Sequence, residues 1–185
     1  MNLDIGYIIV NPDNNLSGLR ISMSSIGKHH FGIPEIIQIL PKGTNAADVK
    51  KHKEVCVDTF KGGDTITSLI NTGFKKLKAE WGMVIFAGSV LKTNTAFRYE
   101  KFVTSDKDVF YPVIGNKYNF VDGSTNGLAV NRKFFNEIGD FPENHMWKLD
   151  EDANINSFEI CKFMWAEAAI ERGCKFKGMI GCKFG

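Results

Sequence analysis

The sequence predicts a single-domain α/β layered fold of the Rossmann-like kind, with a mostly parallel central sheet flanked by helices. Two observations carry this prediction. Short apolar segments rich in β-branched residues alternate with amphipathic or charged segments through the first half of the chain, and most end in a turn rich in Gly, Pro or Asn. The chain also has 185 residues without an internal repeat or linker, a length typical of one domain. We therefore expect one domain over residues 1–185.

Four strands are expected in the first half of the chain. Each of these segments is short, apolar or alternating, and bounded by turn-forming residues. They are residues 5–10, 36–40, 54–60 and 83–91. The last one, MVIFAGSVL, is the most apolar.

Three helices are expected to connect these strands. Residues 16–26 and 65–81 carry apolar side chains three or four positions apart, which predicts helices with one buried face. Residues 45–53 are charged and predict a short exposed helix. Asn15 or Ser17 is expected to cap the first helix and Asp64 the third, because their side-chain oxygens accept hydrogen bonds from the first turn.

The second half of the chain is less periodic. Strands are expected at residues 109–114 and 118–121. A strand running into a short helix is expected over 127–139, and Gly139 is expected to end that helix. Residues 157–172 predict the clearest late helix, which Gly173 ends before a short final strand.

Composition and charge exclude several functional classes. Hydrophobic residues make up 43% and charged residues 24%, which excludes a disordered chain. The net charge of +2 argues against a dedicated nucleic-acid binder. Neither a secretory signal nor an apolar run of about 20 residues, the length of a membrane span, is found. We expect a cytoplasmic protein. The bias toward Lys and Asn is typical of an AT-rich genome, such as that of a virus or phage. If the protein is viral, the expected location is the cytoplasm of the host.

The motifs of several common chemistries are missing. No GxxxxGK[ST] motif occurs, which argues against a P-loop nucleotidase, and Gly88-Ser89 lacks the GxSxG pattern of a serine hydrolase. His29 and His30 are adjacent, so their side chains point apart and do not readily share a metal. The four cysteines form no CxxC pair and are expected to be buried and inert.

Four loops at strand ends are the candidate ligand site. Ligands of an open α/β sheet bind beyond the carboxyl ends of its strands. This rule selects residues 11–15, 41–45, 60–64 and 88–93, which are rich in small and polar side chains. For each loop alone, turn formation is the better explanation, since Gly, Pro and Asn occur in any turn. The prediction therefore depends on the four loops together.

The densest acidic cluster is Asp150-Glu151-Asp152. It marks either a solvated loop or a site for a metal or a general base, since a carboxylate can accept a proton from a hydroxyl nucleophile. Glu159 and Glu167 on the following helix are competing candidates for the base.

Three stretches of the chain resemble the GT-A fold glycosyltransferases, in particular the large family-2 group of inverting sugar transferases. IGYIIVNPDN is similar to that family's opening strand and nucleotide-contact loop. Residues 62–91 are similar to its block of a glycine, an Asn-x-Gly helix and a strand. The third stretch is the most specific, because NGLAVNRKFFNEIGDFPEN is similar to the pattern R-x-x-F-x-x-x-G-x-F-x-E. Its matching positions are Arg132, Phe135, Gly139, Phe141 and Glu143.

This resemblance implies a protein that transfers a sugar from a nucleotide-diphosphate sugar to a hydroxyl acceptor with inversion. Residues 1–91 would bind the nucleotide and 92–185 would lie on the acceptor side. The implied binding residues are Asn11, Pro12, Asp13, Lys42, Gly63, Asp64, Gly88, Ser89 and Arg132. Asp152 is the implied catalytic base, with Glu151 as the second candidate.

One family motif is missing from the sequence. The family holds Mg²⁺ or Mn²⁺ on an Asp-x-Asp motif at the end of the fourth strand, where this chain reads Phe-Ala-Gly-Ser-Val over residues 86–90. A metal on the leaving diphosphate contributes several kcal/mol, and each 1.36 kcal/mol is about tenfold in rate. Mg²⁺ or Mn²⁺ is thus a candidate cofactor, but this sequence lacks the Asp-x-Asp carboxylates that would be expected to bind it. Either Lys42, Arg98 or Arg132 replaces it as the cation, transfer is slow, or the chain is not an enzyme.

Two alternatives to the transferase stay open at this point. One is a non-catalytic GT-A-like domain that still binds the nucleotide-sugar, which the missing motif favours. The other is a structural or interaction domain, such as a viral component. A nucleotidyltransferase of related topology would need paired carboxylates near a strand end, and the sequence does not offer them.

Overall fold

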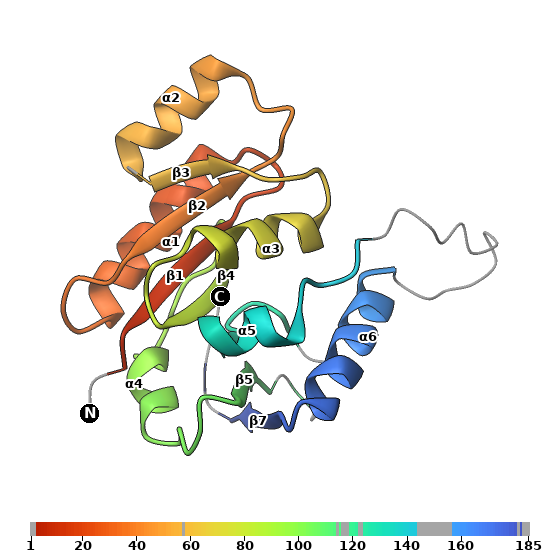
Figure 1. The fold of residues 1–185 in the computed structure, drawn as a ribbon. Helices are drawn as coiled ribbons and strands as arrows, with labels where there is room; N and C mark the ends of the chain where they lie inside the picture. Colours follow the sequence, from red (N-terminus) through yellow and green to blue (C-terminus); the bar gives the residue numbers. More distant parts are fainter. Residues whose placement is uncertain are drawn as a thin grey trace.

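A seven-stranded sheet in the order β3-β2-β1-β4-β6-β5-β7 forms the centre of the molecule (Figure 1). The computed structural model describes residues 3–56, 58–113, 115, 119–121, 124–143, 157–180 and 182. The strands are β1 (Ile5–Val10), β2 (Ile36–Leu40), β3 (Asp58–Lys61), β4 (Trp81–Phe86), β5 (Asp108–Pro112), β6 (Ala129–Asn131) and β7 (Lys175–Met179). β6 runs antiparallel to both of its neighbours, and all other pairs are parallel. The predicted fold, one α/β domain with a mostly parallel sheet, is confirmed.

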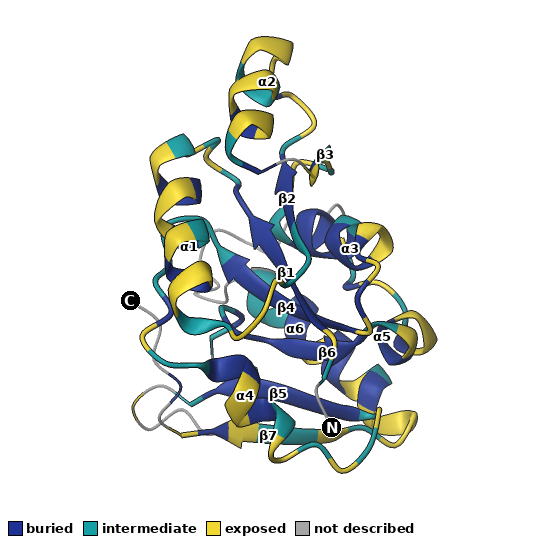
Figure 2. Cartoon of the chain, turned by 90° about the vertical axis from the view of Figure 1, so that its left-hand side faces the viewer, coloured by how far each residue is buried: buried dark blue, intermediate teal, exposed yellow. Residues whose placement is uncertain are grey.

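Helices cover both faces of this sheet, as Figures 1 and 2 show. They are α1 (Leu16–His29), α2 (Ala46–Val55), α3 (Ile66–Lys76), α4 (Thr95–Glu100), α5 (Arg132–Ile138) and α6 (Ser157–Glu171). Alternate residues of β1 face opposite sides: Tyr7 and Ile9 belong to the core under α1 and α4, whereas Ile8 and Val10 belong to the core under α3, α5 and α6. The five inner strands are therefore largely buried, whereas the edge strands β3 and β7 are partly exposed, as are the outward faces of α1 and α2 (Figure 2).

Stacked aromatic rings join α3, α5 and α6 into one layer. Phe74 of α3 stacks on Phe135 of α5 with the ring centroids 3.9 Å apart. Trp165 of α6 stacks on Phe141 at 4.5 Å, and its indole N–H donates to the carbonyl of Gly139 over 3.0 Å. Gly139 ends α5, as predicted, and its φ of +100° is a backbone conformation that glycine adopts readily. Many of the phenylalanines of this chain thus serve the core.

Several expected boundaries are wrong. The expected strand 54–60 begins too early, because α2 continues to Val55 and β3 starts at Asp58. The third helix ends at Lys76, because Leu77 adopts an extended backbone with φ −61° and ψ 141°. The fourth strand starts at Trp81 and ends at Phe86, not at residue 91, since the chain turns away from the sheet at the next residues.

Other local predictions also need correction. The cap of α3 is Thr65, not Asp64, because the Thr65 side chain accepts from the Ser68 N–H in a reciprocal capping box. Asn15 caps α1 as predicted. Residues 119–121 form bends and turns instead of a strand, while residue 118 lies outside the described residues. The fifth strand spans Asp108–Pro112, and helix α4 was not predicted.

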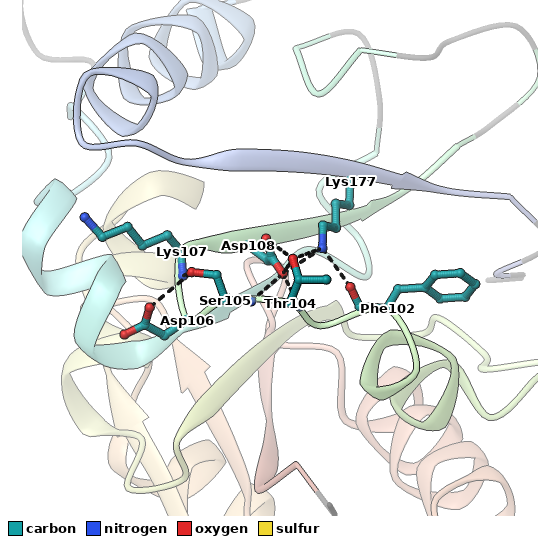
Figure 3. A network of polar contacts seen from close by, with 7 residues as sticks. All are labelled: Phe102, Thr104, Ser105, Asp106, Lys107, Asp108 and Lys177. Atoms are coloured by element: carbon teal, nitrogen blue, oxygen red, sulfur yellow. Dashed lines mark hydrogen bonds and ion pairs between the residues drawn. The ribbon is translucent and has the colours of Figure 1, made fainter.

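A buried ion pair fixes the connection between α4 and β5 (Figure 3). The Asp108 carboxylate is fully buried and accepts hydrogen bonds from Lys177 Nζ at 2.7 Å and from the backbone N–H groups of Thr104 and Ser105. Burial by itself raises the pKa of Asp108, but these hydrogen bonds outweigh it, so its pKa lies below the usual value. The carboxylate is therefore charged and fully engaged at neutral pH.

No helix in the described part of the chain is both long and apolar enough to cross a membrane.

Candidate functional site

The carboxyl ends of β3, β2, β1 and β4 meet at one edge of the sheet, because these four strands are parallel neighbours. Backbone hydrogen bonds continue this pairing into the loops. The N–H of Asn11, after β1, donates to Ile39 of β2 over 3.1 Å, and the N–H of Ala87, after β4, donates to Val10 of β1 over 2.9 Å. The N–H of Gly62 donates to the last residue of β2 over 2.8 Å. The structure thus brings the four predicted loops to the same edge.

The loop after β1 is held by its own first residue. Asn11 is fully buried, and its side-chain oxygen accepts from the Asn15 N–H at 2.8 Å while its amide donates to the Asn15 carbonyl at 3.1 Å. The Asn11 side chain is thereby committed to the loop. Pro12 is half-buried, and Asp13 and Asn15 are exposed, but the Asn15 side chain is engaged as the cap of α1.

Asn14 links this loop to the loop after β2. Its φ of +54° is in the left-handed region that Asn tolerates well. Its amide donates to Asp48 of α2 over 3.1 Å, and Asn45, the cap of α2, donates to the same carboxylate over 2.8 Å. Hydrogen bonds from Lys51, then Asn45 and Asn14, lower the pKa of Asp48. The side-chain oxygen of Asn14 is buried without a partner among the described residues, which leaves an acceptor at the strand ends.

A network of buried polar side chains connects β2 and α2 to the backbone of Asn14. Gln38 of β2 donates through Nε2 to His52 Nδ1 of α2 over 2.9 Å, so the neutral ring carries its proton on Nε2. Burial lowers the pKa of His52, and the smaller effects of the Asn14 carbonyl and Asp48 oppose this shift. The network ties the sheet to α2 and to the backbone of the first loop.

Two glycines let α1 approach the end of β4. Gly88 has φ +98°, and its N–H donates to the Gly18 carbonyl at 3.0 Å and lies 3.1 Å from Ser22 Oγ. A Cβ on Gly18 would lie 2.8 Å from the Asn15 amide and 3.0 Å from the Gly88 nitrogen. Any larger residue at position 18 would therefore push α1 away from this edge.

Residues 124–127 form a further wall of the site that the sequence did not reveal. Asn126 Nδ2 donates to Ser89 Oγ at 2.8 Å, and its Oδ1 accepts from the Phe86 N–H at 3.1 Å. The Gly127 N–H donates to Val84 at 2.7 Å. The Asn-Gly pair before β6 was a turn signal, but nothing in the sequence placed that turn beside β4.

The loop after β3 leads directly into α3. A Cβ on Gly63 would lie 2.4 Å from Ser68 Oγ, so the glycine allows close approach to the first turn of the helix. Asp64 is exposed. Lys42, in the loop after β2, is also exposed and is the cation among the predicted residues at this edge.

Arg132 is not brought to this edge. β6 pairs antiparallel with β4 so that Asn131 lies opposite Trp81, at the start of β4. The Arg132 N–H donates to the Glu80 carbonyl over 2.8 Å, which places this residue at the opposite edge of the sheet. Arg98, another candidate cation, is an exposed residue of α4.

The expected catalytic carboxylates Asp152 and Glu151 lie outside the described residues. The competing Glu159 and Glu167 both belong to α6, which packs on the face opposite α1; Glu159 is half-buried and Glu167 exposed.

The described residues do not fit a divalent metal. Magnesium and manganese prefer carboxylate oxygens, and the residues after β4 offer a hydroxyl and backbone groups. No group of three or more His, Cys, Asp or Glu able to hold a metal occurs among the described residues.

The fold is GT-A-like. No sequence family and no curated protein matches the chain. Among solved structures, it is similar to a mannosyltransferase from Pyrobaculum calidifontis in complex with GDP-Man and Mn²⁺, with a TM-score of 0.69, 13% identity, and coverage of 98% of this chain and 56% of that chain. It is also similar to TarS from S. aureus, with a TM-score of 0.64, 10% identity, and coverage of 100% and 36%.

A third similar structure is the bifunctional IspDF from Campylobacter jejuni, with a TM-score of 0.57, 12% identity, and coverage of 96% of this chain and 50% of that chain. This chain therefore spans about half or less of each of these proteins.

The His52 network predicts a pH dependence of stability. Unfolded histidine has a pKa of about 6.5, and the folded state resists protonation of His52 because a proton on Nδ1 would face the Gln38 amide. The unfolded state then binds more protons as the pH falls, so the free energy of unfolding should decrease between about pH 7.5 and 5.5. Urea denaturation at both pH values measures this decrease.

In the same experiment, His52→Gln should show a smaller decrease. The decrease in stability that remains in this variant is expected to come from His30. The pKa of His30 is also lowered by burial. A decrease in His52→Gln equal to that of the wild type would contradict the role given to His52.

Proposed function

We propose that this chain binds a nucleotide-diphosphate sugar across the carboxyl ends of β1 to β4 and transfers the sugar to a hydroxyl acceptor with inversion. The observation that supports this most is the meeting of four polar loops at one edge of a GT-A-like sheet. The same fold occurs in a mannosyltransferase solved with GDP-Man and Mn²⁺. Fold similarity at this level of identity does not by itself assign a substrate, so the proposal depends on the geometry of the loops.

Each loop has a distinct role in this proposal. The first loop presents Pro12 and Asp13 to the nucleobase, while Asn11 keeps the loop in shape. Gly63 and Asp64 lie near the ribose or the sugar.

The diphosphate is proposed to lie near the end of β4. Gly88 and Ser89 occupy this position, and their lack of long side chains leaves room for the phosphates. Lys42 supplies a positive charge from the loop after β2, which is separated from β4 by β1.

The reaction is a single displacement. The Asp152 carboxylate takes the proton of the acceptor hydroxyl, and the acceptor oxygen forms a bond to the anomeric carbon. The bond from that carbon to the diphosphate breaks on the opposite face, and the nucleoside diphosphate leaves. Glu151 is the second candidate for the base.

A second function is a domain that binds the nucleotide-sugar without turning it over. The residues after β4 favour it, because no carboxylate stands where a metal would assist departure of the diphosphate. The two functions share the binding site. They differ in whether the Asp152 carboxylate is needed for turnover of the bound nucleotide-sugar.

Binding predicts stabilisation of the chain by one class of nucleotide-sugar. A ligand that binds only the native state raises its stability by about 2.7 kcal/mol at 100 times its dissociation constant. The measurement is thermal unfolding with UDP-, GDP-, CMP- and dTDP-sugars, each with Mn²⁺ or with EDTA. We expect the midpoint to rise with one nucleotide.

The arms of this screen separate the proposals. A rise only with Mn²⁺ would show that an ion is held by residues beyond the described ones, whereas a rise in EDTA would support a metal-independent site. No rise with any nucleotide-sugar would contradict both the transferase and the binding domain.

Catalysis predicts that Asp152→Asn binds the nucleotide-sugar normally but turns it over more slowly. Loss of a general base typically costs about 10²–10⁴ in rate. Release of nucleoside diphosphate with water as the acceptor measures turnover for the wild type, for Asp152→Asn and for Glu151→Gln. Asp150→Asn is the matched control from the same acidic cluster. Unchanged turnover in Asp152→Asn and loss in Glu151→Gln would assign the base to Glu151, and no turnover in the wild type would favour the binding domain.

A further inference from the structure

A groove lies on the α1 side of the sheet, where the cover of helices ends. Helix α4 covers part of this face, whereas β7 is an edge strand that pairs only with β5 among the described residues. The space between them is a cavity of about 680 Å³, lined by Arg98, Lys101, Phe102, Thr104, Lys177, Gly178, Met179 and Ile180. Cavities of about 300–1,000 Å³ are typical of small-molecule sites.

The lining combines cations with exposed apolar side chains. Phe102 is 55% exposed and Ile180 is 74% exposed, so the groove presents apolar surface to solvent next to its cations. Arg98 and Lys101 of the α4 segment lie on the same groove, and none of its described lining residues is acidic. This is the complement of a ligand with an anionic group next to an apolar body.

The floor of the groove is held in place by the buried ion pair (Figure 3). Lys177 Nζ donates to the Phe102 carbonyl at 2.7 Å and to Thr104 Oγ1 at 2.8 Å, in addition to Asp108. These bonds fix the segment after α4 against β7, so a ligand need not order it. They also neutralise Lys177, which leaves Arg98 and Lys101 as the other cations of the lining, and Lys101 Nζ lies 4.4 Å from the ring centroid of Phe97.

We propose that this groove binds a small amphiphilic anion, with its phosphate, sulfonate or carboxylate group held by Arg98 and Lys101 and its apolar body on Phe102, Met179 and Ile180. The ligand is a free small molecule, because the surface is a concave groove that a flat membrane surface would not fill. None of the lining residues belongs to the four strand-end loops, so this site stands independently of the proposed transferase.

The test is calorimetric titration with monomeric dodecyl phosphate as the probe. We expect one site per chain, at least tenfold weaker binding of inorganic phosphate, and weaker binding at high salt. The double variant Arg98→Gln/Lys101→Gln should bind dodecyl phosphate about tenfold or more weakly, because charge-assisted hydrogen bonds are lost. The double variant Lys50→Gln/Lys53→Gln, in the exposed part of α2, removes the same charge and should bind like the wild type.

A matched pair also tests the apolar part of the site. Phe102→Ser should weaken binding of dodecyl phosphate, whereas Phe163→Ser, at a residue of α6 that is 50% exposed, should not. The proposal is overturned by the absence of binding, by equal losses in the two charge variants, or by equal affinity for inorganic phosphate. Binding to vesicles of anionic phospholipid but not to the free monomer would likewise overturn it, in favour of a membrane surface.

Discussion

The parallel pairing of β1 with both β2 and β4 is the constraint on which the rest of this structure depends. All six residues of β1 are buried, and its two faces supply both hydrophobic cores. A strand buried on both faces reads as a continuous apolar run, which is why IGYIIV carries almost no polar side chain. Because its neighbours run in the same direction, every loop at its carboxyl end is brought to one edge.

The shape of this edge of the sheet depends on close contacts between backbone segments more than on charged side chains. The Gly18 carbonyl and the Gly88 N–H join α1 to the end of β4, while Asn14 joins the first loop to α2 through Asp48. The site therefore consists mainly of fixed backbone and amide groups, and its described part lacks the carboxylate cluster that a divalent metal requires. Such a surface can recognise a nucleotide by shape and hydrogen bonding, and transfer would then depend on charges from elsewhere in the chain.

The parts of the fold that follow from local pattern could be predicted from the sequence. The alternation of the first four strands with their helices, the cap at Asn15 and the glycine stop at Gly139 all depend on neighbouring residues. The loops after these strands were selected by a rule of topology, and the structure places them together. Boundaries failed at Val55, which α2 retains, and after Phe86, where β4 ends and the chain turns through Gly88 with its positive φ.

The remaining features depend on long-range pairing that the sequence does not display. Asn126 reaches Ser89 only because β6 runs antiparallel beside β4, and the same pairing carries Arg132 to the far edge. The groove beside β7 arises because the last strand pairs with β5 and leaves one face without a helix. Residue types at these positions gave no indication of these contacts.

The central claim is that the four strand-end loops form one nucleotide-sugar site. Hydrogen–deuterium exchange of the chain, with and without GDP-mannose or UDP-glucose, tests it most directly because it reports where the ligand acts. The account predicts slower exchange in residues 11–15, 41–45, 60–64 and 88–93 together, with α6 unchanged. Protection confined to other segments, such as α4 and β7, or no protection with either nucleotide-sugar, would contradict it.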